Sequence, residues 1–161
     1  MSHKDKLTLA PISKISGKVI LPGSKSLSNR ILLLSMLAEG QTEIQNLLDS
    51  DDIHRMVEAM EMLGIELEEN RAENRIKVSG TAGKIPVAEA RLMLGNAGTA
   101  IRPLTAAMTL GHGRYVLDGA PRMRERPIID LVNGLSQLGA KLRCLNNTDC
   151  PPVEVIADGL P

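Results

Sequence analysis

Leu21-Pro22-Gly23-Ser24-Lys25-Ser26-Leu27-Ser28-Asn29-Arg30 opens a block of sequence whose pattern recurs later in the chain. Leu94-Gly95-Asn96-Ala97-Gly98-Thr99-Ala100-Ile101-Arg102-Pro103 stands at the corresponding place in the second block. Each stretch places glycine and small hydroxyl residues immediately before an apolar segment, which is typical of a strand that turns into a helix. These two junctions decide the fold, because the other segments of each block follow them in the same order.

The repeat extends over most of the chain. Arg30 and Arg102 open the two apolar segments, and a Leu-Gly pair ends the next helical segment in each block, at Gly64 and Gly139. Because these residues recur in the same order and at a similar offset in the two blocks, they indicate an internal duplication.

The hydrophobic periodicity predicts a β-α-β-α-β-β order in each block. The first block would begin with a strand in Gly17–Gly23, and its second helix would cover Asp51–Leu63. In the second block, Pro127 is expected to open a helix in its first turn. The predicted buried stripe of that helix is Ile128, Leu131, Val132, Leu135 and Leu138.

The composition excludes several classes of function. The 161 residues include 43% hydrophobic residues but only 1% aromatic ones, so the chain can form a core, and that core must be aliphatic. With Tyr115 as its only aromatic residue, the chain lacks a base-stacking platform or an aromatic cage. The 19 basic and 19 acidic residues balance, which argues against a nucleic-acid or membrane-surface partner.

The remaining polar residues do not indicate a metal site. Cys144 and Cys150 have neither the CxxC nor the Cys/His spacing of a zinc site, and Asp49, Asp51 and Asp52 are interpreted as helix N-terminal residues. No apolar run is long enough to span a membrane, and no signal peptide is evident, so a cytoplasmic location is expected.

Both junctions are candidate anion sites. Lys25 and Arg30 supply positive charge beside the free N–H groups of a helix start, and Gly98 allows close approach of a ligand. Each motif has a simpler interpretation, as a Ser-capped helix with solvated basic residues or as a C-cap glycine followed by an N-cap Thr99. The recurrence of the same kind of junction in both blocks favours anion binding.

The third candidate is Pro121-Arg122-Met123-Arg124-Glu125-Arg126-Pro127. Three arginines in five residues are costly to crowd unless an anion or carboxylates neutralise them, and the flanking prolines restrict the loop. The alternative is an exposed loop screened by water and salt.

At these motifs, and at Asn46-Leu47-Leu48-Asp49-Ser50-Asp51-Asp52, the sequence resembles the 5-enolpyruvylshikimate-3-phosphate (EPSP) synthase family. The resemblance implies an α/β fold made of repeated βαβαββ units in an inside-out barrel. It also implies transfer of the enolpyruvyl group of phosphoenolpyruvate to the 5-hydroxyl of shikimate 3-phosphate, in the shikimate pathway of aromatic amino acid and chorismate biosynthesis. The related UDP-N-acetylglucosamine enolpyruvyl transferases are disfavoured, because residues 120–126 contain no reactive cysteine.

The resemblance also implies roles for individual residues. Lys25 is expected to be catalytic and to contact both substrates, and glyphosate would inhibit at the phosphoenolpyruvate region; no metal or organic cofactor is implied. Arg102 and Arg122–Arg124 are left open between supporting the loop and binding. The residues expected to bind shikimate 3-phosphate are Lys25, Ser26 and Arg30, and those for phosphoenolpyruvate are Lys25, Asn96, Gly98, Thr99 and Arg126.

The chain is much shorter than family members, which have two domains of three units each. Residues 1–20 would be a leader that crosses to the second domain, residues 21–85 the first unit and residues 86–161 the second. With the third unit and the second domain absent, the remainder of the synthase would be needed to complete the cleft. The alternatives are a noncatalytic phosphometabolite-binding module and a stable folding fragment without activity.

Overall fold

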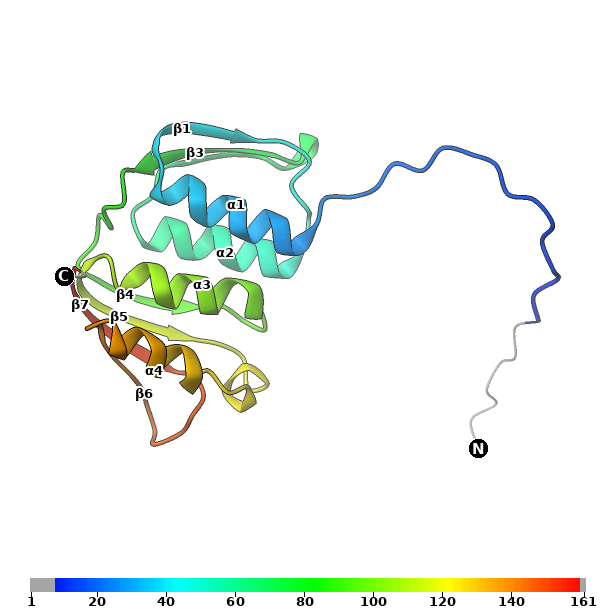
Figure 1. Ribbon diagram of the computed structural model, residues 1–161. Coiled ribbons are helices and arrows are strands. Elements are labelled where there is room, and N and C mark those ends of the chain that lie inside the picture. Colours follow the sequence, from blue (N-terminus) through cyan, green and yellow to red (C-terminus); the bar gives the residue numbers. More distant parts are fainter. Residues whose placement is uncertain (1–7, 160–161) are drawn as a thin grey trace.

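Two β-sheets, one from each repeated block, enclose helices in the computed structural model, which describes residues 8–159 (Figure 1). The first block forms α1 (Lys25–Leu37), β1 (Glu39–Ile44), α2 (Asp51–Met62), β2 (Leu67–Asn70), the 3-10 turn η1 (Arg71–Glu73) and β3 (Arg75–Thr81). The second forms β4 (Glu89–Met93), α3 (Gly98–Met108), β5 (His112–Asp118), the 3-10 turn η2 (Met123–Glu125), α4 (Ile129–Gln137), β6 (Lys141–Cys144) and β7 (Val153–Asp158).

The sheet topology confirms the duplication. The first sheet has the strand order β1-β3-β2, and the second has the order β4-β5-β7-β6. In both, the strand after the first helix pairs antiparallel with the last strand of the block, which pairs antiparallel with the strand before it. Thus β1, β3 and β2 correspond to β5, β7 and β6.

The strand predicted for Gly17–Gly23 is not formed. The described residues before α1 contain neither helix nor strand, and their apolar side chains, including Val19, Ile20 and Leu21, are exposed. In the second block the equivalent position is β4, which pairs parallel with β5. A strand requires a neighbour for its backbone groups, and the alternating pattern in the sequence does not supply one.

The core is aliphatic, as the composition predicts. Helices α1 and α2 pack together, α1 contacts β3, and α3 lies against β5 and β7. The only aromatic side chain, Tyr115, is fully buried and donates its hydroxyl hydrogen bond to the carbonyl of Val87 at 2.8 Å. The largest fully buried side chains of the core also include Leu32, Met36, Ile53, Met56, Met60, Leu92, Ile101 and Leu104.

The last helix differs from its prediction in two respects. It begins at Ile129 instead of Pro127, because the backbone N–H of Ile128 donates to the carbonyl of Asp149 at 2.8 Å and holds the preceding residues outside the helix. Its predicted stripe is buried at Ile128 and Val132, but Leu138 is 65% exposed. Helix α4 packs mainly against β6, so one side of the stripe is left uncovered.

The outer surface of the second sheet carries a buried charge. Glu154 on β7 is almost fully buried and accepts hydrogen bonds from the Nε atoms of Arg114 and Arg143, both at 2.8 Å. These two bonds lower the pKa of Glu154 against the opposing effect of burial. The sheet therefore depends on an ionised carboxylate between two arginines.

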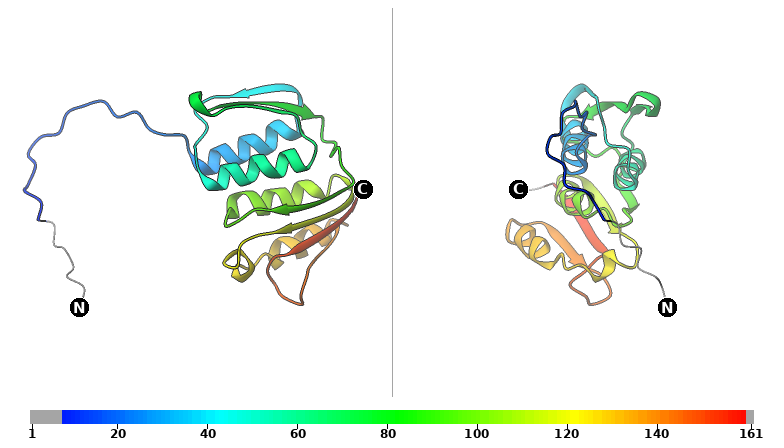
Figure 2. Two further views of the ribbon diagram at one scale, coloured as in Figure 1. Left: turned by 180° about the vertical axis from the view of Figure 1, so that it is seen from behind. Right: turned by 90° about the vertical axis from the view of Figure 1, so that its right-hand side faces the viewer.

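The helix starts gather at one end of the molecule. Figure 1 shows α1, α2 and α3 beginning at the right-hand end, where the loop after β5 also lies. The chain before α1 leaves the body from this same end, as the reverse view in Figure 2 shows. This arrangement brings the motifs of the two blocks to a common surface.

Candidate functional site

The start of α1 is fastened to the loop after β1. A Cβ on Gly23 would lie 2.2 Å from the carbonyl oxygen of Asn46 and 2.9 Å from the backbone nitrogen of Leu48, so only glycine fits here. One turn into the helix, the buried Ser28 hydroxyl accepts a hydrogen bond from the Leu48 N–H at 3.3 Å. The glycine and the serine together fix the position of the helix start.

Lys25 connects α1 with α2. Its Nζ lies 3.0 Å from Oδ2 of Asp52, and the lysine side chain is 51% exposed. Asp51 and Asp52 lie in the first turn of α2, where negative charge is favourable, but the N-cap is Ser50. The interpretation of the acidic group as helix N-terminal residues is therefore incomplete, because Asp52 also pairs with the predicted catalytic lysine.

Helix α3 begins against both α1 and α2. The buried Asn29 of α1 donates from Nδ2 to Oγ1 of Thr99 at 2.7 Å. The α3 N-cap is Ala97, so the alternative that Thr99 is the N-cap is wrong. A Cβ on Gly95, which has φ +52°, would lie 3.5 Å from the side chain of Arg55 in α2. The three helix starts thus contact one another.

The arginine loop after β5 is held by a buried carboxylate. Asp118 is fully buried and accepts two hydrogen bonds from Arg124, at 2.9 and 2.7 Å, and one from the Gly119 N–H at 2.8 Å. Burial opposes ionisation of Asp118, but the hydrogen bonds from Arg124 and Gly119 outweigh it and lower its pKa. Arg122 pairs with Glu125 at 2.6 Å. Carboxylates therefore neutralise two of the three arginines.

The third arginine lies over the start of α3. Arg126 donates from Nη1 to the carbonyl of Asn96 at 3.3 Å. A Cβ on Gly98 would lie 2.7 to 3.0 Å from the guanidinium group, so the two residues are in direct contact. Arg102 donates to the carbonyl of Pro127 at 2.8 Å and so supports the same loop. Within residues 8–159, no ion pair joins Arg126 to a carboxylate.

The predicted site residues fall into three groups on this surface. Ser26 and Arg30 lie one turn apart in α1, beside Lys25, and Arg30 is exposed. The other residues lie at the start of α3 and at the end of η2, and contacts between Asn29 and Thr99 and between Arg126 and Gly98 bring the groups together. The predicted residues gathered here are Lys25, Ser26, Arg30, Asn96, Gly98, Thr99 and Arg126.

Three residues of this surface were not predicted: Asp52, Asn29 and Asp118. A signal existed for Asn29, because it follows Lys25 by four residues and so shares its helix face. Another existed for Asp118, a charged residue at the end of an apolar strand. For Asp52 the sequence offers no signal that names Lys25 as its partner.

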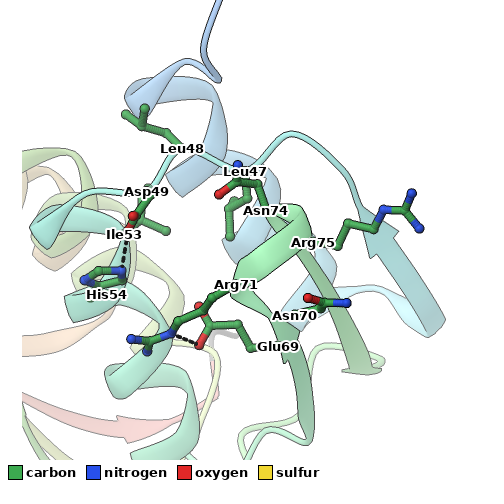
Figure 3. Close-up of a pocket in the computed structure, with 10 residues that line it drawn as sticks. All are labelled: Leu47, Leu48, Asp49, Ile53, His54, Glu69, Asn70, Arg71, Asn74 and Arg75. Atoms are coloured by element: carbon green, nitrogen blue, oxygen red, sulfur yellow. Dashed lines mark hydrogen bonds and ion pairs between the residues drawn. The ribbon is translucent and has the colours of Figure 1, made fainter.

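A small hollow lies outside this surface, between the loop after β1 and η1 (Figure 3). In it, Nε2 of His54 lies 2.8 Å from Oδ1 of Asp49, and Nε of Arg71 lies 2.8 Å from Oε2 of Glu69. Its volume is about 20 Å³, which suits a single water molecule and not a metabolite.

Residues 8–159 contain neither a metal-binding cluster nor a membrane-spanning helix. No group of three or more histidine, cysteine, aspartate or glutamate side chains is arranged to hold a metal ion in this part of the chain. None of its helices has the length and apolar character needed to cross a membrane.

Comparisons with known proteins agree with the geometry. The family model for EPSP synthase (3-phosphoshikimate 1-carboxyvinyltransferase) matches residues 9–160. The chloroplastic 3-phosphoshikimate 1-carboxyvinyltransferase of Petunia hybrida is 58% identical over 96% of this chain and 31% of its own length. The enzyme of that name from Paraburkholderia phymatum is 54% identical over 96% of this chain and 35% of its own length.

The fold is also that of solved structures. An EPSP synthase structure from Acinetobacter baumannii superposes with a TM-score of 0.82 at 24% identity, covering 89% of this chain and 32% of that one. The chain thus spans about a third of the length of the curated relatives it matches. The match of nearly the whole chain to the family model shows that it belongs to the EPSP synthase family.

Proposed function

We propose that this chain supplies the anion-binding part of an active site that transfers the enolpyruvyl group of phosphoenolpyruvate to the 5-hydroxyl of shikimate 3-phosphate, releasing phosphate. The observation that carries the proposal is the meeting of the α1 and α3 starts beneath Arg126, whose charge no carboxylate among the described residues neutralises. Both substrates are anions, and helix N-termini with free guanidinium groups favour anions.

The predicted residues on α1 and those gathered at the start of α3 suit different substrates. Ser26 and Arg30, one turn apart on α1, would hold the phosphate of shikimate 3-phosphate. Asn96, Gly98, Thr99 and Arg126, gathered at the start of α3, would hold phosphoenolpyruvate.

Lys25, next to Ser26 at the start of α1, would contact both substrates. Its charge is shared with Asp52 at 3.0 Å, so the lysine is held in place before a substrate arrives. A bound anion would then compete with the carboxylate for the half-exposed ammonium group.

The proposed reaction depends on positively charged groups, and no cofactor is proposed for it. The 5-hydroxyl of shikimate 3-phosphate gives up its proton and its oxygen bonds to the enol carbon, while the methylene carbon takes a proton and becomes a methyl group. The tetrahedral intermediate then expels phosphate and loses a proton from that methyl group, which restores the enol double bond. Cations fixed before the reaction stabilise the charge that develops on the leaving phosphate. Each charged hydrogen bond contributes roughly 1.5–3 kcal/mol, so loss of Lys25 or Arg126 should strongly weaken binding and turnover.

The remaining parts of the site would come from the rest of the synthase. We propose that residues 1–20 lead to a second domain, that residues 21–85 and 86–161 are the first two units of one domain, and that the proton-transfer groups lie elsewhere. Glyphosate would occupy the phosphoenolpyruvate region. A cytoplasmic location stays a prediction, since the plant relatives are described as chloroplastic.

The test measures binding and turnover separately. The purified chain is titrated with each substrate by calorimetry, and phosphate release is followed with both substrates present. We expect weak, saturable binding that Lys25→Ala abolishes, with no turnover by the chain alone. Lys84→Ala is the matched control, because Lys84 is an exposed lysine distant in sequence from all three motifs.

Two results would contradict the proposal. Turnover by the isolated chain, abolished by Lys25→Ala, would show that it is an enzyme without the rest of the synthase. Absence of binding of either substrate at millimolar concentration would leave a folding fragment without a function of its own.

A further inference from the structure

Within residues 8–159, the Arg126 guanidinium makes a single hydrogen bond, at 3.3 Å, to the carbonyl of Asn96, so other contacts must hold it over Gly98. We propose that Asp118, acting through Arg124, is a positioning residue that sets where the Arg126 guanidinium stands. This inference rests on the proposed function, in which Arg126 binds phosphoenolpyruvate, and goes beyond it by assigning a role to a residue that contacts no substrate.

The first support is the environment of the Asp118 carboxylate. It has no exposed surface, yet both oxygens are satisfied: Arg124 donates to each of them, Arg91 donates to Oδ2 at 3.3 Å, and the Gly119 N–H donates to Oδ1. Two parallel bonds from one guanidinium fix direction as well as distance. Arg124 is therefore held rigidly at the end of β5.

The second support is the path of the chain from Asp118 to Arg126. The Asp118 carbonyl accepts from Leu94 N–H, and Ala120 N–H donates to the Gly95 carbonyl, both at 2.9 Å, so the loop begins fastened to the α3 junction. Its end is held by η2, where the Arg126 N–H donates to the Met123 carbonyl at 3.1 Å, and by Arg102, which donates to the Pro127 carbonyl at 2.8 Å. Arg124 lies within η2, two residues before Arg126.

The third support is the distribution of charge. Arg124 and Arg126 are close enough in sequence to compete for one anion. Because Asp118 neutralises Arg124, that guanidinium is occupied, while no ion pair with a carboxylate is found for Arg126 in the described part of the chain. The carboxylate therefore both anchors η2 and leaves a single arginine available at the start of α3.

The test compares arginine variants of the same loop. In Arg124→Gln the anchor is lost, in Arg124→Lys the charge is kept without the forked geometry, and in Arg122→Gln an exposed arginine paired with Glu125 is removed as a control. Asp118→Asn is the complementary variant. In the Arg124 variants, Arg91 and the Gly119 N–H still donate to the buried Asp118 carboxylate, and thermal unfolding of each variant establishes that it is folded.

Two readouts are taken on each variant of the chain. NMR of the Arg126 Nε–H group, through its heteronuclear NOE, reports the order of the guanidinium without any ligand. Titration with phosphoenolpyruvate, followed at the Gly98 amide, reports affinity, and shikimate 3-phosphate is titrated in parallel.

We expect Arg124→Gln to make the Arg126 side chain mobile and to weaken phosphoenolpyruvate binding about tenfold, with shikimate 3-phosphate binding unchanged. Arg124→Lys should restore part of the affinity, and Arg122→Gln should match the wild type in both readouts.

An ordered Arg126 and unchanged affinity in a folded Arg124→Gln variant would overturn the inference. Equal weakening for both substrates would also overturn it, because that indicates general damage. If the wild-type chain does not bind phosphoenolpyruvate, the proposed function fails, while the order of Arg126 still decides whether Asp118 positions it.

Discussion

Replacing Gly98 with alanine should move Arg126 without harming the fold. Gly98 is the first residue of α3 and has no positive φ, so alanine is accommodated by the backbone, and a helix favours alanine over glycine by roughly 0.5–1 kcal/mol. The new Cβ would lie 2.7, 2.9 and 3.0 Å from Nη2, Nη1 and Cζ of Arg126. Ordinary contact begins at 3.4 Å, so the guanidinium must retreat by several tenths of an ångström.

This displacement would lengthen the hydrogen bond between Arg126 and Asn96, which is already long. The Arg126 Nη1 to Asn96 carbonyl distance is already 3.3 Å, so further movement breaks this hydrogen bond. The displaced guanidinium would then also lose a charged hydrogen bond to phosphoenolpyruvate, worth roughly 1.5–3 kcal/mol, which corresponds to a loss of about tenfold or more in affinity. Glyphosate, which we place in the same region, should lose affinity for the same reason.

Calorimetric titration and thermal unfolding of the Gly98→Ala chain test this. We expect weaker binding of phosphoenolpyruvate and glyphosate, unchanged binding of shikimate 3-phosphate, and an unfolding temperature equal to or above that of the wild type. Gly134→Ala in α4 is the matched control, because its Cβ meets nothing within 4 Å. If the Gly98→Ala chain binds phosphoenolpyruvate and glyphosate with wild-type affinity, the placement of the phosphoenolpyruvate site is refuted. A complete synthase that carries this change should be less sensitive to glyphosate.

Three further changes have defined outcomes. Gly23→Ala forces a Cβ to 2.2 Å from the Asn46 carbonyl oxygen, a backbone atom that cannot retreat, so we expect a loss of about 1–3 kcal/mol, seen as a lower unfolding temperature. Glu154→Gln should lower stability at neutral pH. Since the pKa of Glu154 is lowered in the folded state, its contribution is present above the ordinary value of 4.5 and is lost as pH falls through the lowered pKa, so the unfolding temperatures of variant and wild type should converge in acid. Thr99→Val removes the acceptor of the Asn29 amide and leaves it buried without a partner, which should cost about 1–3 kcal/mol in denaturant unfolding; an unchanged midpoint would show that this bond does not join the helices.

The fold could be predicted wherever its cause is local in sequence. Helix α2 was predicted over Asp51–Leu63 and is found at Asp51–Met62, because its apolar spacing and its terminal glycine act within one or two turns. The strand predicted in Gly17–Gly23 has a suitable pattern and does not form, since its formation depends on a neighbour that the pattern does not specify. Strand pairing depends on two segments of the chain, and the pattern of one segment does not identify the other.

The candidate site, like the fold, could be predicted only where its cause is local in sequence. The junctions at Lys25 and Gly98 were recognisable because each is a continuous motif at a helix start. The bond between Asn29 and Thr99 was not, since its two ends are 70 residues apart and neither residue type identifies the other. For the loop with three arginines, the sequence left open whether carboxylates or an anion neutralise the charge, and that choice depends on side-chain direction.

Although the formal charges of the whole chain balance, they do not balance at the candidate site. Lys25 is paired with Asp52, Arg124 with Asp118 and Arg122 with Glu125, and the composition reveals none of these pairs. Among the predicted substrate-binding cations, Arg30 on α1 and Arg126 beside α3 have no ion pair with a carboxylate within residues 8–159. If both stayed free in the complete protein, they would repel each other and any approaching cation. Two anions, one for each of these arginines, would remove that cost, which is why a site of this form suits a reaction between two anionic substrates.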